Sequence, residues 1–548
     1  MSGPAVPAPT LMVQGTASGV GKSLLVTALC RIFARRGVHV VPFKAQNMSN
    51  NAAVTVDGGE VGRAQALQAR AAGVRPDVRM NPVLLKPLAD TRSDVVVLGR
   101  SDPDAAMLPW HERRERLWPV VAESLDALRA EADLVIIEGA GSPAETNLRR
   151  SDIVNMAVAH HAAAPVLLAA DIDRGGAFAA LYGTWSLLDT ADRARIRGFI
   201  LNRFRGDPSL LSPAPDDLRR RTGVPTLGIV PYTRHRLPEE DAMGLASAGN
   251  GTVTIAAVRV PHIANFDDLD PLAAEPGARV RWVDRPESLD DAAAIILPGT
   301  RNTLADLRWL WDTGLAAAIR ARCRAGIEVV GLCGGYQMLG RRVRDPAGIE
   351  AGGECAGLGL LDIETVLAPE KTTRPTRAAI TPCPGPLGRL AGTTIEGYEI
   401  HHGHTTLHGT TRAWLVAGEE VIGAVAGSGP PGGSAGGSAG GDRDRCAIGG
   451  AGGAGGCGAG VTAGRNGRGT DDGAAGAIAP PAWGAYLHGL FHNDAFRHAW
   501  LDSLCAAHAE SAWELRVERE IDRIADVVEN ALDMGRIEAL VHRSAPCD

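Results

Sequence analysis

A cysteine stands between an apolar run and a pair of glycines in the segment VVGLCGGYQMLG, residues 329–340. The run before it is typical of a buried strand, and the residues after it favour a helix. Glycines beside the cysteine let the backbone bend tightly and approach a substrate without clashes from Cβ atoms. A nucleophile at a strand-to-helix turn has this pattern, and the start of the helix would favour the thiolate of Cys333. The same stretch also fits a core cysteine beside a tight turn, and that alternative stays open.

A catalytic thiolate needs a base, usually a histidine that folding brings close. We expect His488, in AYLHGLF, to be that base, because it ends a strand-like run and is followed by glycine. The competing candidates are His401, His402 and His404 in GYEIHHGHTT. A lone histidine at a strand end is more often structural, so this alternative also stays open.

Backbone N–H groups near the cysteine would stabilise the oxyanion that forms when a thiolate attacks a carbonyl group. The segment ILPGTRNT offers Gly299 and its neighbours for half of this site. The residue after the cysteine, Gly334, offers the other half. With a base, these groups would complete an acyl-transfer site.

Residues 15–23 read GTASGVGKS, after the strand-like LMVQ and before the helix-like LLVTALCRIFARRG. A strand, a glycine-rich loop, Lys-Ser and a helix are the context of a phosphate-binding loop. Lys22 would neutralise the β- and γ-phosphates, and the Ser23 hydroxyl would bind Mg²⁺. A plain glycine-rich turn is the alternative. The other loop residues expected to bind ATP are Gly15, Thr16, Gly19 and Gly21.

Polar residues also end other strand-like runs of this half. Glu138 ends VIIE, where a carboxylate would hold Mg²⁺ directly or through water, with an edge salt bridge as the alternative. Asn202 follows another apolar run in ILNRF, where it is either a site residue or a turn residue. The loop DIDRGGAF places Asp171, Asp173 and Arg174 after a strand. This loop suits a metal, a phosphate or a substrate carboxylate, and the three residues are not assigned separately.

Strands that alternate with helices must position these groups. Such alternation predicts a parallel sheet covered on both faces, with ligands at the carboxyl ends of the strands. A polar, glycine-containing stretch near residue 250 separates two such series. The expected strands are 11–15, 132–141, 164–173 and 196–204 in the first series, and 253–261, 292–300 and 327–335 in the second.

We therefore expect an α/β protein with a doubly wound P-loop domain at 1–250 and a second α/β domain at 251–505. Residues 427–478 are rich in Gly, Ala and Ser, with almost no apolar bulk to offset the entropy of ordering. We expect them to be a disordered insertion in the second domain. Residues 506–548 are a C-terminal extension without an assigned role.

The composition excludes several classes of protein. With 548 residues the chain is too long for one core. A net charge of -7 without a basic tract argues against a nucleic-acid partner. Nine cysteines without a C-x-x-C pair suit a reducing cytoplasm. There is no apolar run of membrane-spanning length and no signal-peptide pattern at the N-terminus, so we expect a cytoplasmic protein without a membrane partner.

The phosphate loop has five residues, rather than the standard four, between Gly15 and Gly21. This variant resembles the loop of dethiobiotin synthetases and related amide-forming enzymes, and that resemblance implies that Asn202 reads adenine. Ala17 stands where the partition ATPases carry a signature lysine, which weighs against that branch.

The segments GLCGGYQMLG, PGTRNT and YLHG resemble the class I glutamine amidotransferases. In that family the cysteine attacks the side-chain amide of glutamine, and the resemblance implies that Gln337 helps hold this substrate. The family usually has Glu two residues after the histidine, where this chain has Leu490. The third member of a catalytic triad is therefore absent or comes from elsewhere.

Apart from the insertion and the C-terminal extension, the chain resembles the cobyric acid synthase family. The resemblance rests on further segments such as PFKAQNMSNNA, RMNPVLLKP, NLRRSDIVNMAVA and ADIDRGGAFAALYGT. It implies ATP- and Mg²⁺-dependent amidation, with L-glutamine as nitrogen donor, of four peripheral carboxylates of a corrinoid, adenosylcobyrinic acid a,c-diamide. One alternative is a cobyrinic acid a,c-diamide synthase, which would be expected to lack RMNPVLLKP and NLRRSDIVNMAVA. The other is a non-synthetic P-loop ATPase with an inactive amidase-like domain.

We predict that deleting residues 430–476 leaves glutamine hydrolysis and amide formation nearly intact. The cost of closing a loop rises slowly with its length, so stability should change by about 1–2 kcal/mol at most. The measurement is kcat/KM for glutamine hydrolysis in the deletion variant and the full chain, at a temperature where both are folded. A loss of about a hundredfold with unchanged melting would instead make the segment a functional lid.

Overall fold

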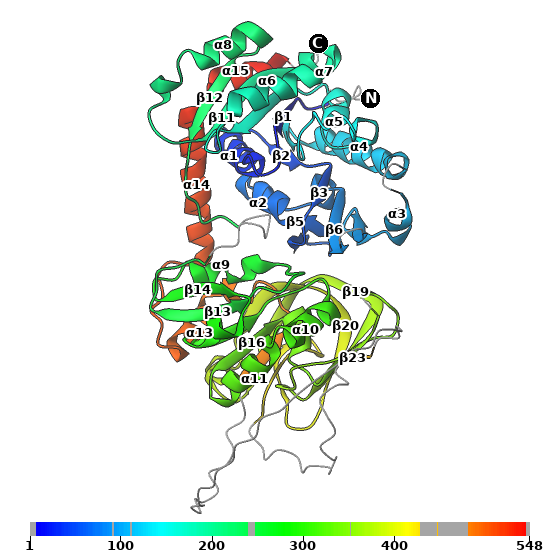
Figure 1. The fold of residues 1–548 in the computed structure, drawn as a ribbon, viewed down its shortest axis with the longest axis vertical. Coiled ribbons are helices and arrows are strands. Elements are labelled where there is room, and N and C mark those ends of the chain that lie inside the picture. The colour runs from blue at the N-terminus through cyan, green and yellow to red at the C-terminus, as the bar shows by residue number, and fades with distance from the viewer. Residues whose placement is uncertain are drawn as a thin grey trace, which may run out of the picture.

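The computed structural model describes residues 7–89, 92–109, 112–238, 247–350, 352–427, 446–447 and 481–543. Apart from Gly427 and residues 446–447, the insertion predicted at 427–478 lies outside the described residues. Two α/β units lie one above the other, with the N-terminal unit at the top of Figure 1.

The first unit is built on a six-stranded parallel sheet with the strand order β12-β11-β10-β1-β9-β2. Neighbouring residues of β1 enter different apolar clusters, Met12 on one face and Leu11 and Val13 on the other. Burial on both faces explains why the strands read as nearly continuous apolar runs. The strands are β1 (Thr10–Gly15), β2 (Val40–Phe43), β9 (Leu134–Glu138), β10 (Val166–Asp171), β11 (Ile196–Phe204) and β12 (Thr226–Pro231).

Helices cover both faces of this sheet, as expected for a doubly wound domain (Figure 1). The fold class predicted from the sequence is confirmed. The helices are α1 (Lys22–Arg35), α2 (Arg63–Ala71), α3 (Pro103–Met107), α4 (Arg113–Glu131), α5 (Met156–His161), α6 (Ala177–Leu187), α7 (Thr190–Arg195) and α8 (Ala214–Thr222).

A smaller sheet and a hairpin face the second unit. Buried residues of these strands, Ala52, Leu84 and Val96, form an apolar cluster with Ile400 of the second unit. The small sheet has the order β3-β6-β7-β8, and β4 pairs with β5. The strands are β3 (Gln46–Met48), β4 (Ala52–Val54), β5 (Glu60–Gly62), β6 (Val83–Ala89), β7 (Arg92–Val97) and β8 (Arg100–Ser101).

The second unit combines parallel and antiparallel strands in one sheet. The order β14-β13-β15-β16-β24 is parallel, and β22 then pairs antiparallel with β24. Val425 pairs with Trp483, so the strands flanking the predicted insertion are hydrogen-bonded neighbours. The parallel strands are β13 (Val253–Val258), β14 (Ala278–Val283), β15 (Ala294–Leu297), β16 (Glu328–Leu332) and β24 (Ala482–Ala485).

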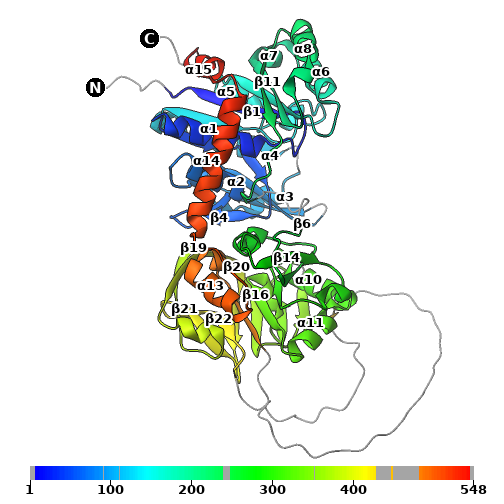
Figure 2. The same cartoon turned by 90° about the vertical axis from the view of Figure 1, so that its left-hand side faces the viewer.

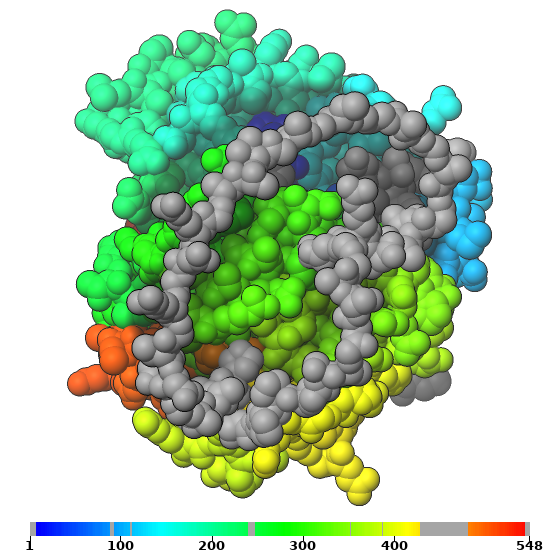
Figure 3. Space-filling model, turned by 60° about the horizontal axis from the view of Figure 1, so that its bottom comes forward, coloured from blue at the N-terminus to red at the C-terminus, as the bar shows by residue number. Residues whose placement is uncertain are grey.

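The sheet continues beyond β22 through β21, β19, β17 and β18, and the long strands β19 and β20 pair with each other. The remaining strands are β17 (Arg342–Asp345), β18 (Gly353–Ala356), β19 (Ile363–Ile380), β20 (Thr394–Leu407), β21 (Arg412–Ala417), β22 (Glu420–Val425) and β23 (Cys446–Ala447). The helices are α9 (Asp270–Ala273), α10 (Thr303–Asp312), α11 (Leu315–Arg324), α12 (Gly334–Met338) and α13 (Asp494–Ser503). In the space-filling view of Figure 3, orange residues from after position 480 lie beside green residues of this unit.

The C-terminal extension returns to the first unit. Helix α14 (Trp513–Ala531) runs along the side of the molecule from the second unit to the first, and α15 (Met534–Arg543) follows it (Figure 2). Buried residues of α14 such as Ile521 and Ile524 join the apolar cluster that contains Leu25 and Leu29 of α1. Ion pairs surround this contact, including Arg35 with Asp522 and Asp526 and Arg36 with Glu529.

Buried charges also join the two units. The Glu60 carboxylate of the hairpin accepts hydrogen bonds from Lys86 of its own unit and Lys371 of the other. Burial alone would raise the pKa of Glu60, but the two ammonium groups hold it below its ordinary value. Arg301 and Asp94 form a second bridge, with 3.1 Å between nitrogen and oxygen. Removing one partner of such a set leaves a buried charge uncompensated.

In the ranges that the structure covers, no helix has both the length and the apolar character needed to span a membrane.

We predict that Ile521→Ala lowers the free energy of unfolding by about 2–5 kcal/mol, because it empties a fully buried site between α14 and α1. Leu515→Ala is the matched control, since Leu515 lies on the same helix but is 54% exposed. The control should change stability by less than about 0.5 kcal/mol. Urea denaturation followed by circular dichroism measures both. Equal effects would show that α14 does not stabilise the first unit through this contact.

Candidate active sites

The phosphate loop connects the end of β1 to the start of α1. Gly19 and Gly21 both have positive φ, at 71° and 92°. A Cβ atom on Gly21 would lie 2.3 Å from Nδ2 of Asn202, so only glycine fits this position. The Lys22 ammonium group, which is nearly buried, donates to the carbonyl oxygens of Ala17 at 3.0 Å and Gly141 at 3.2 Å.

Asn202 lies against the loop, and its Nδ2 donates to the carbonyl oxygen of Val20 at 2.8 Å. The structure therefore brings together Asn202 and the loop residues predicted to bind ATP. Asn202, which lies on β11, therefore also supports the loop through its side-chain amide.

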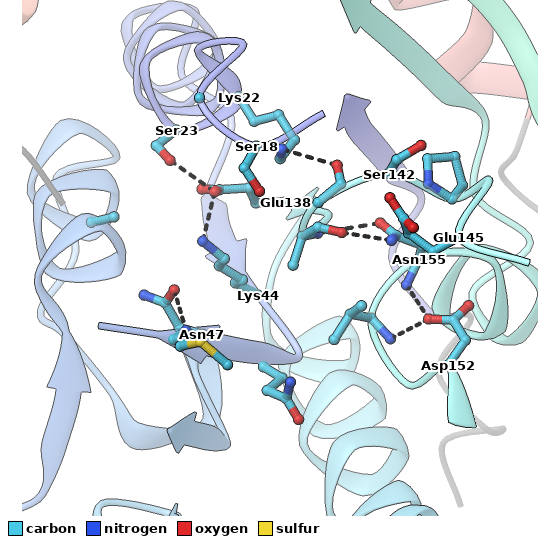
Figure 4. Close-up of a pocket in the computed structure, with 18 of the residues that line it drawn as sticks. Ser18, Lys22, Ser23, Lys44, Asn47, Glu138, Ser142, Glu145, Asp152 and Asn155 are labelled. Atoms are coloured by element: carbon cyan, nitrogen blue, oxygen red, sulfur yellow. Dashed lines mark hydrogen bonds and ion pairs between the residues drawn. The ribbon is translucent and has the colours of Figure 1, made fainter. Parts of the chain in front are cut away.

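Glu138 ends β9 directly beneath the start of α1 (Figure 4). The Ser23 hydroxyl donates to its Oε1 at 2.8 Å, so the two residues predicted to bind metal are in contact. Lys44 donates to the same oxygen at 2.9 Å, and Gln68 donates to Oε2 at 2.5 Å. Lys44 and Gln68 were not predicted from the sequence, because their contacts depend on where β2 and α2 pack.

The Ser23 and Glu138 oxygens fit Mg²⁺, which takes hard oxygen ligands and usually keeps waters and substrate phosphates among them. Among the described residues, no group of three or more His, Cys, Asp or Glu side chains could hold a metal ion. A site with two protein oxygens beside a phosphate loop agrees with a metal that binds together with a nucleotide.

A cavity of about 880 Å³ opens beside the phosphate loop. Figure 4 shows Lys22, Ser23, Lys44 and Glu138 on one side of it, and Asn155 on the other. The cavity is lined by several basic side chains, namely Arg113, Arg114, Arg149, Arg174 and Arg203.

The loop after β10 contributes unequally to this cavity. Arg174 lines it, whereas Asp171 and Asp173 do not. Oδ2 of Asp171 is 3.0 Å from Nη1 of Arg203, and Oδ1 of Asp173 is 2.7 Å from Nε of Arg205. Both aspartates therefore form ion pairs with arginines at the end of the neighbouring strand, β11.

Cys333 occupies the turn between β16 and α12. Its φ is 50°, which is rare for a residue with a side chain and typical of strain kept at a functional site. The glycines around it are needed, because a Cβ atom on Gly335 would lie 2.0 Å from the carbonyl oxygen of Leu297. The turn therefore has the shape predicted for a nucleophile, and the Cys333 thiol is almost buried.

His488 makes the contacts expected of a catalytic base. Its Nδ1 is 2.6 Å from Oδ2 of Asp268, and the N–H of Gly489 donates to the other oxygen of this carboxylate. Burial disfavours the charged imidazole, but Asp268 and Cys333 outweigh it and raise the pKa of His488 to about 10. Cys333 is among the groups that raise this pKa, so it lies near the His488 ring, while the thiol itself donates to the carbonyl oxygen of Ile400 at 3.5 Å.

Asp268 holds the position of a third triad member, which was not predicted from the sequence. It lies in the short 3-10 helix Phe266–Leu269, and it is 2% exposed. His488 offsets the effect of burial and holds the pKa of Asp268 below its ordinary value. The segment NFDDLD carries no local pattern for this role, since the acid comes 220 positions before the histidine.

The competing histidines have other partners. His401 is 3.2 Å from Glu399 and stacks on Tyr486, and Nδ1 of His402 lies 3.0 Å from the carbonyl oxygen of Ala368. Burial lowers the pKa of both imidazoles.

The residues predicted for the oxyanion and glutamine sites surround the cysteine. A Cβ atom on Gly334 would lie 3.1 Å from the backbone nitrogen of Thr300, and one on Gly299 would lie 3.2 Å from the His488 ring. The Gln337 amide is buried, donates to the carbonyl oxygen of His402 and accepts from Thr303. Gln337 therefore also fixes the wall of the site.

Comparisons with known proteins agree with this pair of sites. Residues 11–244 match the family described as CobQ/CobB/MinD/ParA nucleotide binding domain, and residues 254–429 match the CobB/CobQ-like glutamine amidotransferase domain. A cobyric acid synthase of Nocardia farcinica is 43% identical over 98% of this chain and 97% of its own length. Those of Chloroflexus aggregans and Deinococcus radiodurans are 46% and 54% identical, over 96% and 72% of this chain and 97% and 84% of their own lengths.

We predict that Asp268→Asn lowers kcat for glutamine hydrolysis by about 10²–10⁴-fold, because the carboxylate orients the His488 imidazole and stabilises its protonated form. Loss of that carboxylate also lowers the pKa of His488, which Asp268 now raises. The imidazolium that protonates departing ammonia is then lost at lower pH, so the alkaline limb of the pH–rate profile should move to lower pH. An unchanged profile would exclude Asp268 from the triad. Ammonia-driven amide formation, measured on the same preparation, is the control.

Proposed function

Because the chain belongs to the cobyric acid synthase family, we propose that it converts adenosylcobyrinic acid a,c-diamide to adenosylcobyric acid. The chain is a glutamine-dependent ligase of cobalamin biosynthesis. Our proposal concerns the substrate and the positions, which are the carboxylates b, d, e and g. It is supported by one observation above all: a Cys333–His488–Asp268 triad and an arginine-lined cavity beside a phosphate loop occur in the same chain.

The first half-reaction releases ammonia. The Cys333 thiolate attacks the side-chain amide carbon of glutamine, and N–H groups at Gly334 and next to Gly299 stabilise the oxyanion. The His488 imidazolium gives its proton to the amide nitrogen, so that the C–N bond breaks and ammonia leaves a thioester behind. His488 then takes a proton from water, whose oxygen attacks the thioester and releases glutamate and the thiolate.

The second half-reaction activates the acceptor. An acceptor carboxylate attacks the γ-phosphorus of ATP, ADP leaves, and the acyl phosphate is then attacked by ammonia with loss of phosphate and a proton. Lys22 neutralises charge on the transferring group. Mg²⁺ held by Ser23 and Glu138 would supply further positive charge to the phosphates. We propose that adenine binds to the side-chain oxygen Oδ1 of Asn202, since the side-chain nitrogen Nδ2 already donates to the carbonyl oxygen of Val20.

The cavity suits an acceptor with several carboxylates. Five arginines line it, and three of them also pair with aspartates: Arg149 with Asp192, and Arg174 and Arg203 with Asp171. Guanidinium groups bind carboxylates in a planar, two-pronged geometry. Four carboxylates must reach one phosphate in turn, so we expect the arginines to bind whichever carboxylates are not reacting. On this proposal Asp171 and Asp173 orient arginines, and Arg174 contacts the acceptor.

Two variants test whether Cys333 acts in the release of ammonia and Lys22 in the activation of the acceptor. Cys333→Ser should abolish glutamine-driven synthesis but leave ammonia-driven synthesis, because the acceptor chemistry belongs to the first unit. Lys22→Ala should reduce synthesis with either nitrogen source by about 10²–10³-fold, a usual loss when a group that stabilises transition-state charge is removed. Products with one to four added amides are separated and counted by mass spectrometry.

Glutamine-driven synthesis by Cys333→Ser would contradict the role of the thiol. Near-normal ammonia-driven synthesis by Lys22→Ala would contradict the role of the loop. Cobyrinic acid serving as a better acceptor than its a,c-diamide would redirect the proposal to the other corrinoid amidation.

A further inference from the structure

One short helix, α2, touches both active sites. At its N-terminal end Arg63 reaches the second unit, with Nε 2.9 Å from Oδ2 of Asp267. The same guanidinium group donates to the Tyr398 hydroxyl and, at 3.2 Å, to the carbonyl oxygen of Ala52. Arg63 therefore crosses the junction between the units and contacts the neighbours of the triad.

Asp267 and Tyr398 both adjoin triad members. Asp267 directly precedes Asp268 in the chain and is 1% exposed, and Arg63 is the cation paired with it. The Tyr398 ring stacks on the His488 ring with 5.2 Å between centroids, and the two backbones exchange hydrogen bonds. A shift of Arg63 would therefore move Asp267, which precedes Asp268 in the chain. It would also move the Tyr398 ring, which stacks on His488.

The other contacts of α2 lead to the nucleotide site. Gln68, five residues after Arg63, donates to Oε2 of Glu138 at 2.5 Å. Ala64 and Leu67 line the 880 Å³ cavity. Gln65 accepts from Asn47, which also lines the cavity.

We propose that α2 couples the two sites, and that Arg63 is a positioning residue through which occupation of the nucleotide and acceptor cavity sets the rate of glutamine hydrolysis. The proposal rests on the proposed function, in which Glu138 binds metal with the nucleotide. A metal ion at Glu138 competes for the carboxylate that Gln68 now holds, and an acceptor in the cavity presses on Ala64 and Leu67. Either event displaces a helix whose first residue holds Asp267 and Tyr398.

The experiment measures glutamate formation by the full chain, with and without ATP, Mg²⁺ and adenosylcobyrinic acid a,c-diamide. In the unaltered protein we expect these ligands to stimulate hydrolysis by about 5–150-fold, the usual range of coupling between sites. Arg63→Gln should reduce the stimulation to less than about twofold, with the loss in kcat rather than in KM for glutamine. Arg63→Lys keeps a cation beside Asp267 and should restore part of the stimulation.

Arg70→Gln is the matched control, because Arg70 is on the same helix but pairs with Glu514 and Glu518 of α14. It should keep the stimulation of the unaltered protein. If Arg63→Gln does not fold, the variant Arg63→Gln/Asp267→Asn, which removes both buried charges, is measured in its place with the same expectation.

Full stimulation in a folded variant that lacks the Arg63 cation overturns the coupling proposal. Failure of the unaltered protein to form amides from ammonia and ATP would instead overturn the proposed function, so the two failures are distinguishable. Equal loss of stimulation in Arg63→Gln and Arg70→Gln would also overturn the proposal, because it would show a general effect of loosening α2.

Discussion

The contact between His488 and Asp268 is the constraint on which the second unit depends. Both side chains are buried, and taking two charges out of water is costly unless every oxygen and proton is satisfied. The imidazole and the Gly489 N–H together satisfy both carboxylate oxygens. The contact joins β24 to a segment before α9, so the parallel strands between them must keep their register. The contact raises the pKa of His488, so in the mechanism that we propose its imidazolium can protonate departing ammonia.

Both proposed active sites use the same property of parallel sheets, in which the carboxyl ends of neighbouring strands meet at one edge. In the first unit the phosphate loop follows β1 and Glu138 ends the adjacent β9. In the second, Cys333 follows β16 and His488 follows the adjacent β24. The glycines Gly21 and Gly335 leave room for neighbouring groups in each case. The proposed phosphate site and the proposed glutamine site are therefore both built at the carboxyl ends of adjacent parallel strands.

The fold, the phosphate loop and the cysteine elbow could be predicted because each is encoded in a short segment. Strand-like runs and their glycines fix the turns at Lys22 and Cys333 through local backbone geometry. Asp268 could not be found in this way, since its role exists only after strands far apart in the chain have paired. Lys44 and Gln68 were missed for the same reason. The aspartates after β10 are recognisable as polar strand-end residues, but only packing shows that they pair with Arg203 and Arg205.

The C-terminal extension contacts two helices of the first unit, α1 and α2. Glu518 of α14 pairs with Arg31 of α1 and, at 2.7 Å, with Arg70 of α2. One side chain thus links α1, which begins at Lys22, with α2, which begins at Arg63. Exposed ion pairs contribute little stability individually, but the apolar face of α14 is buried against α1. The ion pairs of Arg70 lie at the C-terminal end of α2, whereas Arg63, at its N-terminal end, makes the contacts with Asp267 and Tyr398.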